Sequence, residues 1–247
     1  MKLVQILKNS EWNKIGITFI LIMSILLLSP ISGIAQTNGI AIIWDVSVSR
    51  KTDRKTDTKD FANKIYGELA LNNKRSGQGA NFYLGTVGEN SFPKVDVISL
   101  QPVNWLMTPK DVREDSVQEF KDKFETGINK LFTIPLTDQG TFFYRGVVYI
   151  AEQMNREEDY HKMIIFSDLL ESSILFQISD LKPKDILPNY ENIKKKLTAD
   201  TPIPDIFQEM EIVLVCNGIN EIEVQTARFW KKFFESAGST VYIRTSY

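Results

Sequence analysis

The chain has very few residues of the two types that form most soft-metal and nucleophilic sites. Its 247 residues include one cysteine, Cys216, and one histidine, His161. A single cysteine excludes an intramolecular disulfide framework and a cysteine-rich zinc site. A single histidine excludes paired-histidine metal sites, and no G-x-S-x-G sequence accompanies it. We expect His161 to be a surface residue and Cys216, in an apolar run, to be a buried small hydrophobe.

A strong charge of either sign is also absent. The 29 basic and 31 acidic residues give a net charge of −2, which argues against a nucleic-acid partner because such proteins present a basic face or stripe. No phosphate-binding sequence G-x-x-x-x-G-K-[ST] occurs. The 43% hydrophobic residues fit a globular protein and exclude a disordered one.

The N-terminal segment has the parts of an export signal. Three lysines precede an uncharged apolar run over residues 15–35, which is broken by a proline and ends in small residues before Gln36. This pattern predicts a signal peptide over residues 1–35 that is removed before Gln36. The alternative is an uncleaved membrane anchor, because about 20 apolar residues suffice to span a bilayer. Both interpretations place residues 36–247 in the periplasm, at the cell surface or in the medium.

The exported part alternates apolar strands with amphipathic helices. Short apolar runs predict strands at residues 40–44, 81–87, 95–100, 162–167, 211–216 and 239–244. Three- and four-residue spacing of apolar side chains predicts helices at residues 60–71, 115–132, 142–155, 190–197 and 221–236. Prolines punctuate an irregular segment at about 172–208. The alternation predicts a single three-layer, Rossmann-like α/β domain, with a mostly parallel central sheet and helices on both faces.

Oxygen-bearing side chains stand where ligands bind in such sheets, beyond the carboxyl ends of the strands. Asp45, Ser47 and Ser49 alternate directly after the first strand, so that period two places them on one side of the chain. Thr141 precedes a predicted helix, and Asp168 closes another strand. These five residues form an all-oxygen set, which suits hard divalent cations such as Mg²⁺.

The same residues resemble the metal-ion-dependent adhesion site of von Willebrand factor type A domains. The resemblance rests on D-x-S-x-S at residues 45–49, on a threonine after a glycine at Gly140-Thr141, and on Phe166-Ser167-Asp168 at a strand end. It covers residues 38–247. It implies that Ser47, Ser49 and Thr141 bind the metal directly through their hydroxyls, and that Asp45 and Asp168 act mostly through metal-bound waters.

The resemblance also implies a function. The family's site leaves one coordination position for a carboxylate from a partner protein, so we expect metal-dependent protein binding or adhesion at the cell envelope. The cation would be Mg²⁺ or another divalent ion such as Mn²⁺ or Ca²⁺. The membrane would be contacted only through an uncleaved N-terminal segment.

The sequence departs from the family pattern at three places. Leu169 stands where the family has a glycine after the last aspartate, and Gln139-Gly140 replaces a double glycine. A charged stretch over residues 50–57 separates Ser49 from the next helix. Its basic residues would form a partner-binding rim beside the metal: Arg50, Lys51, Arg54 and Lys55.

Other interpretations stay open at this point. The polar residues after the first strand could cap the next helix, Thr141 could be a helix N-cap, and Asp168 a turn residue. The domain could be a structural envelope component with an idle metal site. A Mg²⁺-dependent phosphohydrolase of the haloacid dehalogenase type would need a second aspartate where Ser47 stands, so we expect no enzyme. Phe92 and Trp105 are aromatic contact candidates.

Overall fold

The computed structural model describes residues 36–47, 57–71, 77–89, 92–104, 107–173, 176–218 and 220–247. Residues 1–35 lie outside the described residues, so the export signal stays a prediction. Among the described residues, no helix combines the length and apolarity needed to cross a membrane.

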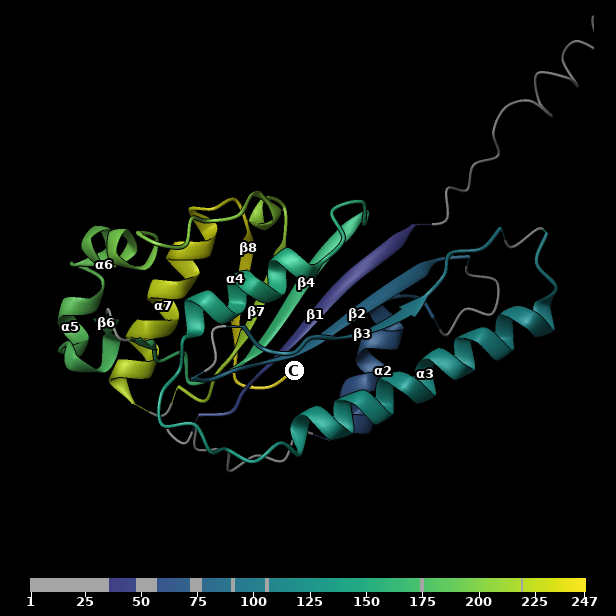
Figure 1. The fold of residues 1–247 in the computed structure, drawn as a ribbon, viewed down its shortest axis with the longest axis horizontal. Coiled ribbons are helices and arrows are strands. Elements are labelled where there is room, and N and C mark those ends of the chain that lie inside the picture. The colour runs from purple at the N-terminus through teal and green to yellow at the C-terminus, as the bar shows by residue number, and fades with distance from the viewer. Residues whose placement is uncertain are drawn as a thin grey trace, which may run out of the picture. The chain divides into compact units, whose positions relative to one another are not determined.

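The core of the domain is a six-stranded, mostly parallel sheet (Figure 1). Strands β1, β2, β4, β7 and β8 run parallel, and β3 pairs antiparallel with β2 at one end of the order β3-β2-β1-β4-β7-β8. This confirms the predicted fold class. The strands are β1 (Thr37–Asp45), β2 (Gly79–Val87), β3 (Asp96–Leu100), β4 (Tyr160–Phe166), β7 (Glu211–Val215) and β8 (Thr240–Arg244).

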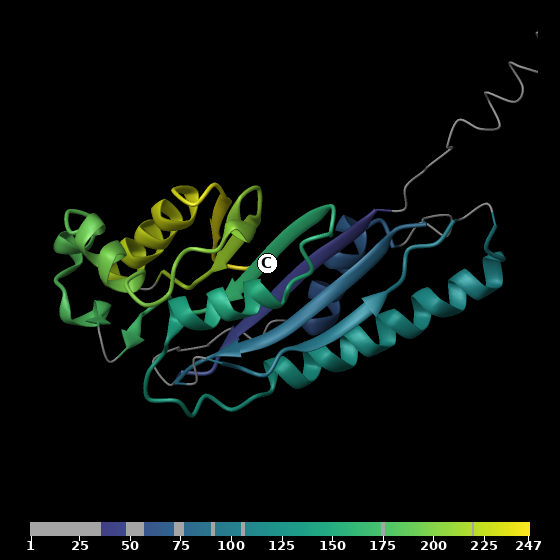
Figure 2. The same cartoon turned by 45° about the horizontal axis from the view of Figure 1, so that its top comes forward.

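Helices cover both faces of this sheet, as Figures 1 and 2 show. On one face lie α2 (Thr58–Glu68) and α3 (Lys110–Phe132). On the other lie α4 (Phe143–Gln153), α5 (Pro183–Ile186), α6 (Tyr190–Leu197) and α7 (Glu221–Glu235). The helices and the sheet together make the predicted three layers.

Strand β1 shows why the sheet must be covered twice. Ile40, Ile42 and Trp44 face the core under α2 and α3, whereas Ala41 and Ile43 face the core under α4 and α7. All five are at most 6% exposed. A strand that is apolar at every position is stable only with both of its faces buried, which is the condition of a central parallel strand.

Two regions differ from the sequence prediction. Helix α3 begins at Lys110, five residues before the predicted start, because its first turn is polar and carries no apolar periodicity. The irregular segment at 172–208 contains more regular structure than expected. Besides the predicted helix α6, it holds the two-stranded hairpin β5 (Ser172–Ser173) and β6 (Phe176–Gln177), the short helix α5, and two 3₁₀ turns. Elements of two to four residues are too short to show a period.

Candidate functional site

Asp45 ends β1 in the middle of the carboxyl edge of the sheet. The register pairs Trp44 with Phe166 of β4, which brings Asp45 beside Ser167. The hydroxyl of Ser167 donates to Asp45 Oδ2 at 2.5 Å, and the backbone N–H of Ser47 donates to Asp45 Oδ1 at 2.8 Å. Asp45 is fully buried. Its carboxylate therefore ties the end of β4 to the turn that carries Ser47.

Ser47 lies just beyond β1, against the loop that joins α3 to α4. It forms an isolated parallel bridge with Asp138, and the N–H of Thr137 donates to Val46 O at 3.0 Å. Ser47 is 1% exposed. The loop thus continues the sheet for one bridge past the end of β1 and brings its next residues to the same edge.

Thr141 lies in that loop, one residue before the N-cap of α4. The N–H of Phe142 donates to Gly88 O at 2.8 Å, and Thr141 O accepts from the N–H of Ser172 at 2.8 Å. The first bond fastens Thr141 to the end of β2, and the second to the segment that follows Asp168. Backbone bonds to two strand ends therefore hold Thr141 at the carboxyl edge.

Asp168 follows β4 and begins a tight turn. Its Oδ1 accepts from the N–H of Leu170 at 3.1 Å. This oxygen therefore has the role that the turn interpretation of Asp168 predicts. Leu169 has φ = 65°, the left-handed conformation that favours glycine. Its carbonyl accepts from Trp230 Nε1 at 2.9 Å, and its side chain is fully buried. The turn thus has a glycine-like backbone conformation at Leu169 while the leucine side chain adds to the core.

Four of the five predicted ligands therefore share one edge of the sheet and are buried: Asp45, Ser47, Thr141 and Asp168. Ser49 and the basic rim of Arg50, Lys51, Arg54 and Lys55 fall outside the described residues, as does Trp105. In the described ranges, no group of three or more His, Cys, Asp and Glu residues is placed to hold a metal. The donors here are two carboxylates and two hydroxyls, a set whose chemistry fits a hard cation.

The capping roles that these residues could have had are filled by others. Asp57 is the N-cap of α2, where its carboxylate accepts from the N–H groups of Lys59 and Asp60. At the start of α4 the carboxylate of Glu171 accepts from the N–H of Tyr144 at 2.8 Å, and the N-cap residue is Phe142. Helix capping therefore does not account for Asp45 or Thr141. The sequence gives no periodic signal for Glu171, which contacts α4 only after the chain has folded.

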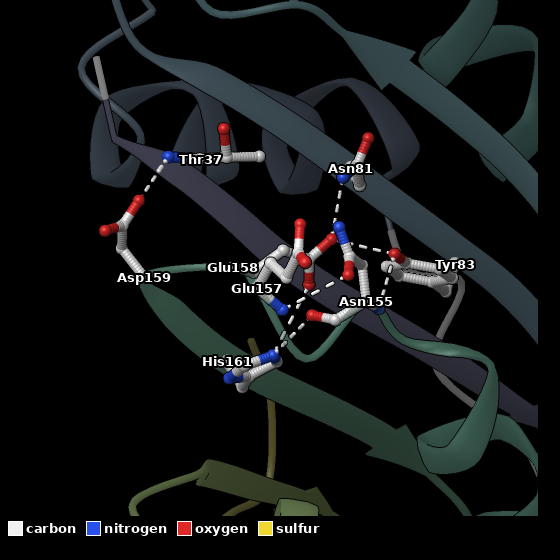
Figure 3. A network of polar contacts seen from close by, with 8 residues as sticks. All are labelled: Thr37, Asn81, Tyr83, Asn155, Glu157, Glu158, Asp159 and His161. Atoms are coloured by element: carbon white, nitrogen blue, oxygen red, sulfur yellow. Dashed lines mark hydrogen bonds and ion pairs between the residues drawn. The ribbon is translucent and has the colours of Figure 1, made fainter. Parts of the chain in front are cut away.

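A second polar cluster lies at the opposite, amino edge of the sheet (Figure 3). Glu158, in the turn before β4, has a fully buried side chain. Its Oε1 accepts from Asn81 Nδ2 and from the hydroxyl of Tyr83, both at 2.7 Å. Its Oε2 lies against Gly39, where a Cβ would come within 1.6 Å of it. Burial raises the pKa of the Glu158 carboxyl, although the bonds from Asn81 and Tyr83 lower it.

The prediction for His161 is corrected by this cluster. Its side chain is only 16% exposed, and its Nε2 lies 2.9 Å from Asn155 O and 3.6 Å from Glu158 Oε2. A cavity of about 590 Å³ opens beside it, between the start of β4 and residues 205–209. Pairing with the backbone of a neighbouring turn, which the sequence does not reveal, draws the ring inward.

Two other predictions can be checked directly. Cys216 is buried as expected, and burial raises the pKa of its thiol to about 11, which makes it a poor nucleophile. Phe92 is 71% exposed and packs edge-on against Tyr149 of α4 with ring centroids 5.4 Å apart, so it stays available as a contact residue.

No protein-family model and no curated protein matches the chain. Similar solved structures include proximal thread matrix protein 1 from the mussel byssus, with a zinc-occupied MIDAS motif (14% identity, TM-score 0.41), and a von Willebrand factor type A protein from Catenulispora acidiphila (14% identity, TM-score 0.40). The matches cover 86% and 85% of this chain but only 42% and 38% of those chains. These neighbours include the family that the sequence resembles. The Rossmann-like fold itself is established by the sheet order and the layers.

Proposed function

We propose that the domain is an exported, non-enzymatic module that binds one divalent cation at the carboxyl edge and uses it to hold a protein partner. The observation that carries the proposal is the convergence of Asp45, Ser47, Thr141 and Asp168 from three separate chain segments on that edge. Asp45 ends β1, Thr141 precedes α4 and Asp168 follows β4. Sheet register and backbone bonds hold each of them there.

The donor types support a cation that stays reactive toward an outside anion. Hydroxyls of Ser47 and Thr141 are neutral, and the two carboxylates supply at most two negative charges. A bound Mg²⁺ or Mn²⁺ supplies a positive centre that a partner's Asp or Glu can complete. Asp45 is oriented by the Ser47 N–H and the Ser167 hydroxyl, so its oxygens are fixed before any ion arrives.

The test compares two buried carboxylates at opposite edges. Full-length protein is titrated with Mn²⁺ by calorimetry as wild type, as Asp45→Asn and as Glu158→Gln. We expect the first variant to weaken Mn²⁺ binding by about 10–100-fold and the second to leave it unchanged. Equal affinity of all three proteins, or no binding by wild type, would contradict the proposal.

Partner capture separates adhesion from a structural role with an idle metal site. Envelope extract is passed over immobilised wild type and Asp45→Asn with Mg²⁺ and with chelator. Capture that needs both Mg²⁺ and Asp45 supports adhesion. Capture that is the same with Mg²⁺ and with chelator, and the same for wild type and Asp45→Asn, supports the structural role. Release of phosphate from a generic phosphate ester with Mg²⁺, absent in Asp45→Asn, would instead favour the phosphohydrolase.

A further inference from the structure

Two carboxylates that the sequence did not single out join the loops around the candidate cation site. Glu89 lies two residues beyond β2, and Asp138 lies in the loop that carries Thr141. The N–H of Glu89 donates to Asp138 Oδ2 at 2.8 Å, and the N–H of Gln139 donates to Glu89 Oε1 at 2.8 Å. The Asp138 side chain thus accepts from the backbone of Glu89, and the Glu89 side chain accepts from the residue after Asp138, much as in the reciprocal capping box of a helix. We call this pair the carboxylate clasp.

The clasp sits between two of the ligand-bearing segments. Asp138 is the residue that bridges to Ser47, and Thr141 follows it by three positions. Gly88, next to Glu89, accepts from the N–H of Phe142. A Cβ on Gly88 would come within 2.0 Å of Asp138 Oδ2, so the close approach of the carboxylate requires a glycine there. The clasp therefore fixes the Thr141 loop to the end of β2, while the bridge between Asp138 and Ser47 fixes the same loop to the end of β1.

We infer that Glu89 and Asp138 are positioning residues that set the cation affinity of the site by holding Thr141 in register with Ser47. This inference rests on the proposed function. Mg²⁺ demands near-octahedral geometry, so a ligand displaced by a fraction of an ångström loses much of its contribution. A loop that must be ordered by the ion itself also costs conformational entropy at the moment of binding.

Charge and geometry can be separated with conservative variants. Glu89→Gln keeps an oxygen that can accept from Gln139 but removes the negative charge, whereas Glu89→Ala removes both. If the clasp acts by position, the glutamine variant keeps most of the affinity and the alanine variant does not. If it acts only by charge, both lose the same amount.

The experiment measures Mn²⁺ affinity and backbone amide exchange of the full chain in parallel. We expect Glu89→Ala and Asp138→Ala to weaken Mn²⁺ binding by about tenfold, with Glu89→Gln close to wild type. In metal-free protein, Glu89→Ala should speed exchange at Gln139, and Asp138→Ala at Glu89. The matched control is Asp159→Ala, which removes an exposed carboxylate that accepts from the N–H of Thr37 at the amino edge. That variant should leave Mn²⁺ affinity unchanged.

The outcomes distinguish this inference from the function on which it rests. Wild-type affinity in both alanine variants would overturn the clasp while leaving cation binding intact. Equal losses in Glu89→Gln and Glu89→Ala would overturn positioning in favour of charge. Failure of wild type to bind Mn²⁺ would overturn the proposed function and the clasp's role with it. Faster amide exchange in the alanine variants would then show that the clasp only holds the Thr141 loop in place and has no role in cation binding.

Discussion

The two edges of the sheet bury their carboxylates in different surroundings. At the carboxyl edge, Asp45 accepts from a hydroxyl and a backbone N–H and lies among hydroxyl-bearing residues from separate loops. At the amino edge, Glu158 is enclosed by Asn81, Tyr83 and the backbone of Gly39. Oxygen donors gathered from several loops suit a ligand, whereas a carboxylate closed in by side chains of neighbouring strands holds those strands together. Burial of a carboxylate alone therefore does not identify a site.

The largest expected effect on stability is at the amino edge. The Lys162 side chain is 5% exposed, and its Nζ pairs with Glu68 at 2.6 Å and with Glu211 at 2.9 Å. Burial by itself lowers the pKa of Lys162, but hydrogen bonds with Glu68, Tyr247 and Glu211 outweigh it and raise the pKa. The charged lysine therefore stabilises the fold at pH values below the ordinary lysine pKa where the two glutamates are ionised, and this contribution is lost as pH rises through the folded pKa of Lys162.

Lys162→Met should accordingly lower the free energy of unfolding by about 2–3 kcal/mol, at the lower end for a buried pair because both glutamates keep access to water. Urea denaturation measures this. The control is Lys130→Met, which breaks an exposed pair with Asp96 and should change stability by under about 0.5 kcal/mol. A loss of Mn²⁺ binding in Lys162→Met would contradict the view that the amino edge stabilises the fold independently of the cation site at the carboxyl edge.

The next effect tests the unusual leucine at the carboxyl edge. Leu169→Gly relieves a left-handed backbone conformation, which is worth about 1 kcal/mol, but removes a fully buried side chain, which costs about 3 kcal/mol. We expect a net loss of about 2 kcal/mol in urea denaturation, with cation affinity retained. A more stable glycine variant would show that backbone strain, not core packing, dominates this turn.

A smaller effect separates capping from ligand binding. Asp57→Ala removes the N-cap of α2 and should lower the free energy of unfolding by about 1 kcal/mol. Mn²⁺ affinity should not change, since we assign the ligand role to Asp45 and the cap to Asp57. Calorimetry measures the Mn²⁺ affinity of this variant. A loss of Mn²⁺ binding would show that Asp57 also contributes to the cation site and would contradict the assignment of separate roles to Asp45 and Asp57.

The smallest effect at neutral pH concerns Glu158. Its pKa is raised above the ordinary value of 4.5 in the folded protein, so folding favours the protonated form. Wild type should therefore lose stability as pH rises from about 4.5 through the folded pKa, relative to Glu158→Gln, which cannot ionise. At pH 7 we expect the variant to be at least as stable as wild type. Parallel urea titrations from pH 4 to 8 measure the difference. A constant difference across that range would contradict the raised pKa.

Much of the fold was predictable from local patterns. Apolar runs, such as those at residues 40–44 and 211–216, located every strand of the main sheet. The three- and four-residue spacing of apolar side chains, as in α7, located the longer helices of both layers. The start of α3 and the short elements α5, β5 and β6 were not predictable, because a polar first turn and segments of two to four residues carry no periodic signal. Tertiary contacts, not propensity, stabilise such pieces.

The candidate site was predictable in the edge of the sheet that holds its described residues, whereas their role as metal ligands stays a prediction. The sequence by itself determined that any metal site must use oxygen ligands, since one histidine and one cysteine cannot complete a site alone, and that Asp45 and Asp168 lie at strand ends. The tertiary structure decided how the segments meet. Strand register places Asp45 beside Ser167, the carboxylate clasp joins the Thr141 loop to β2, and Glu171 takes the capping role at α4. These contacts join residues 27 to 122 positions apart. Side-chain spacing along a chain encodes which face a residue occupies, but only packing decides which distant partner it meets.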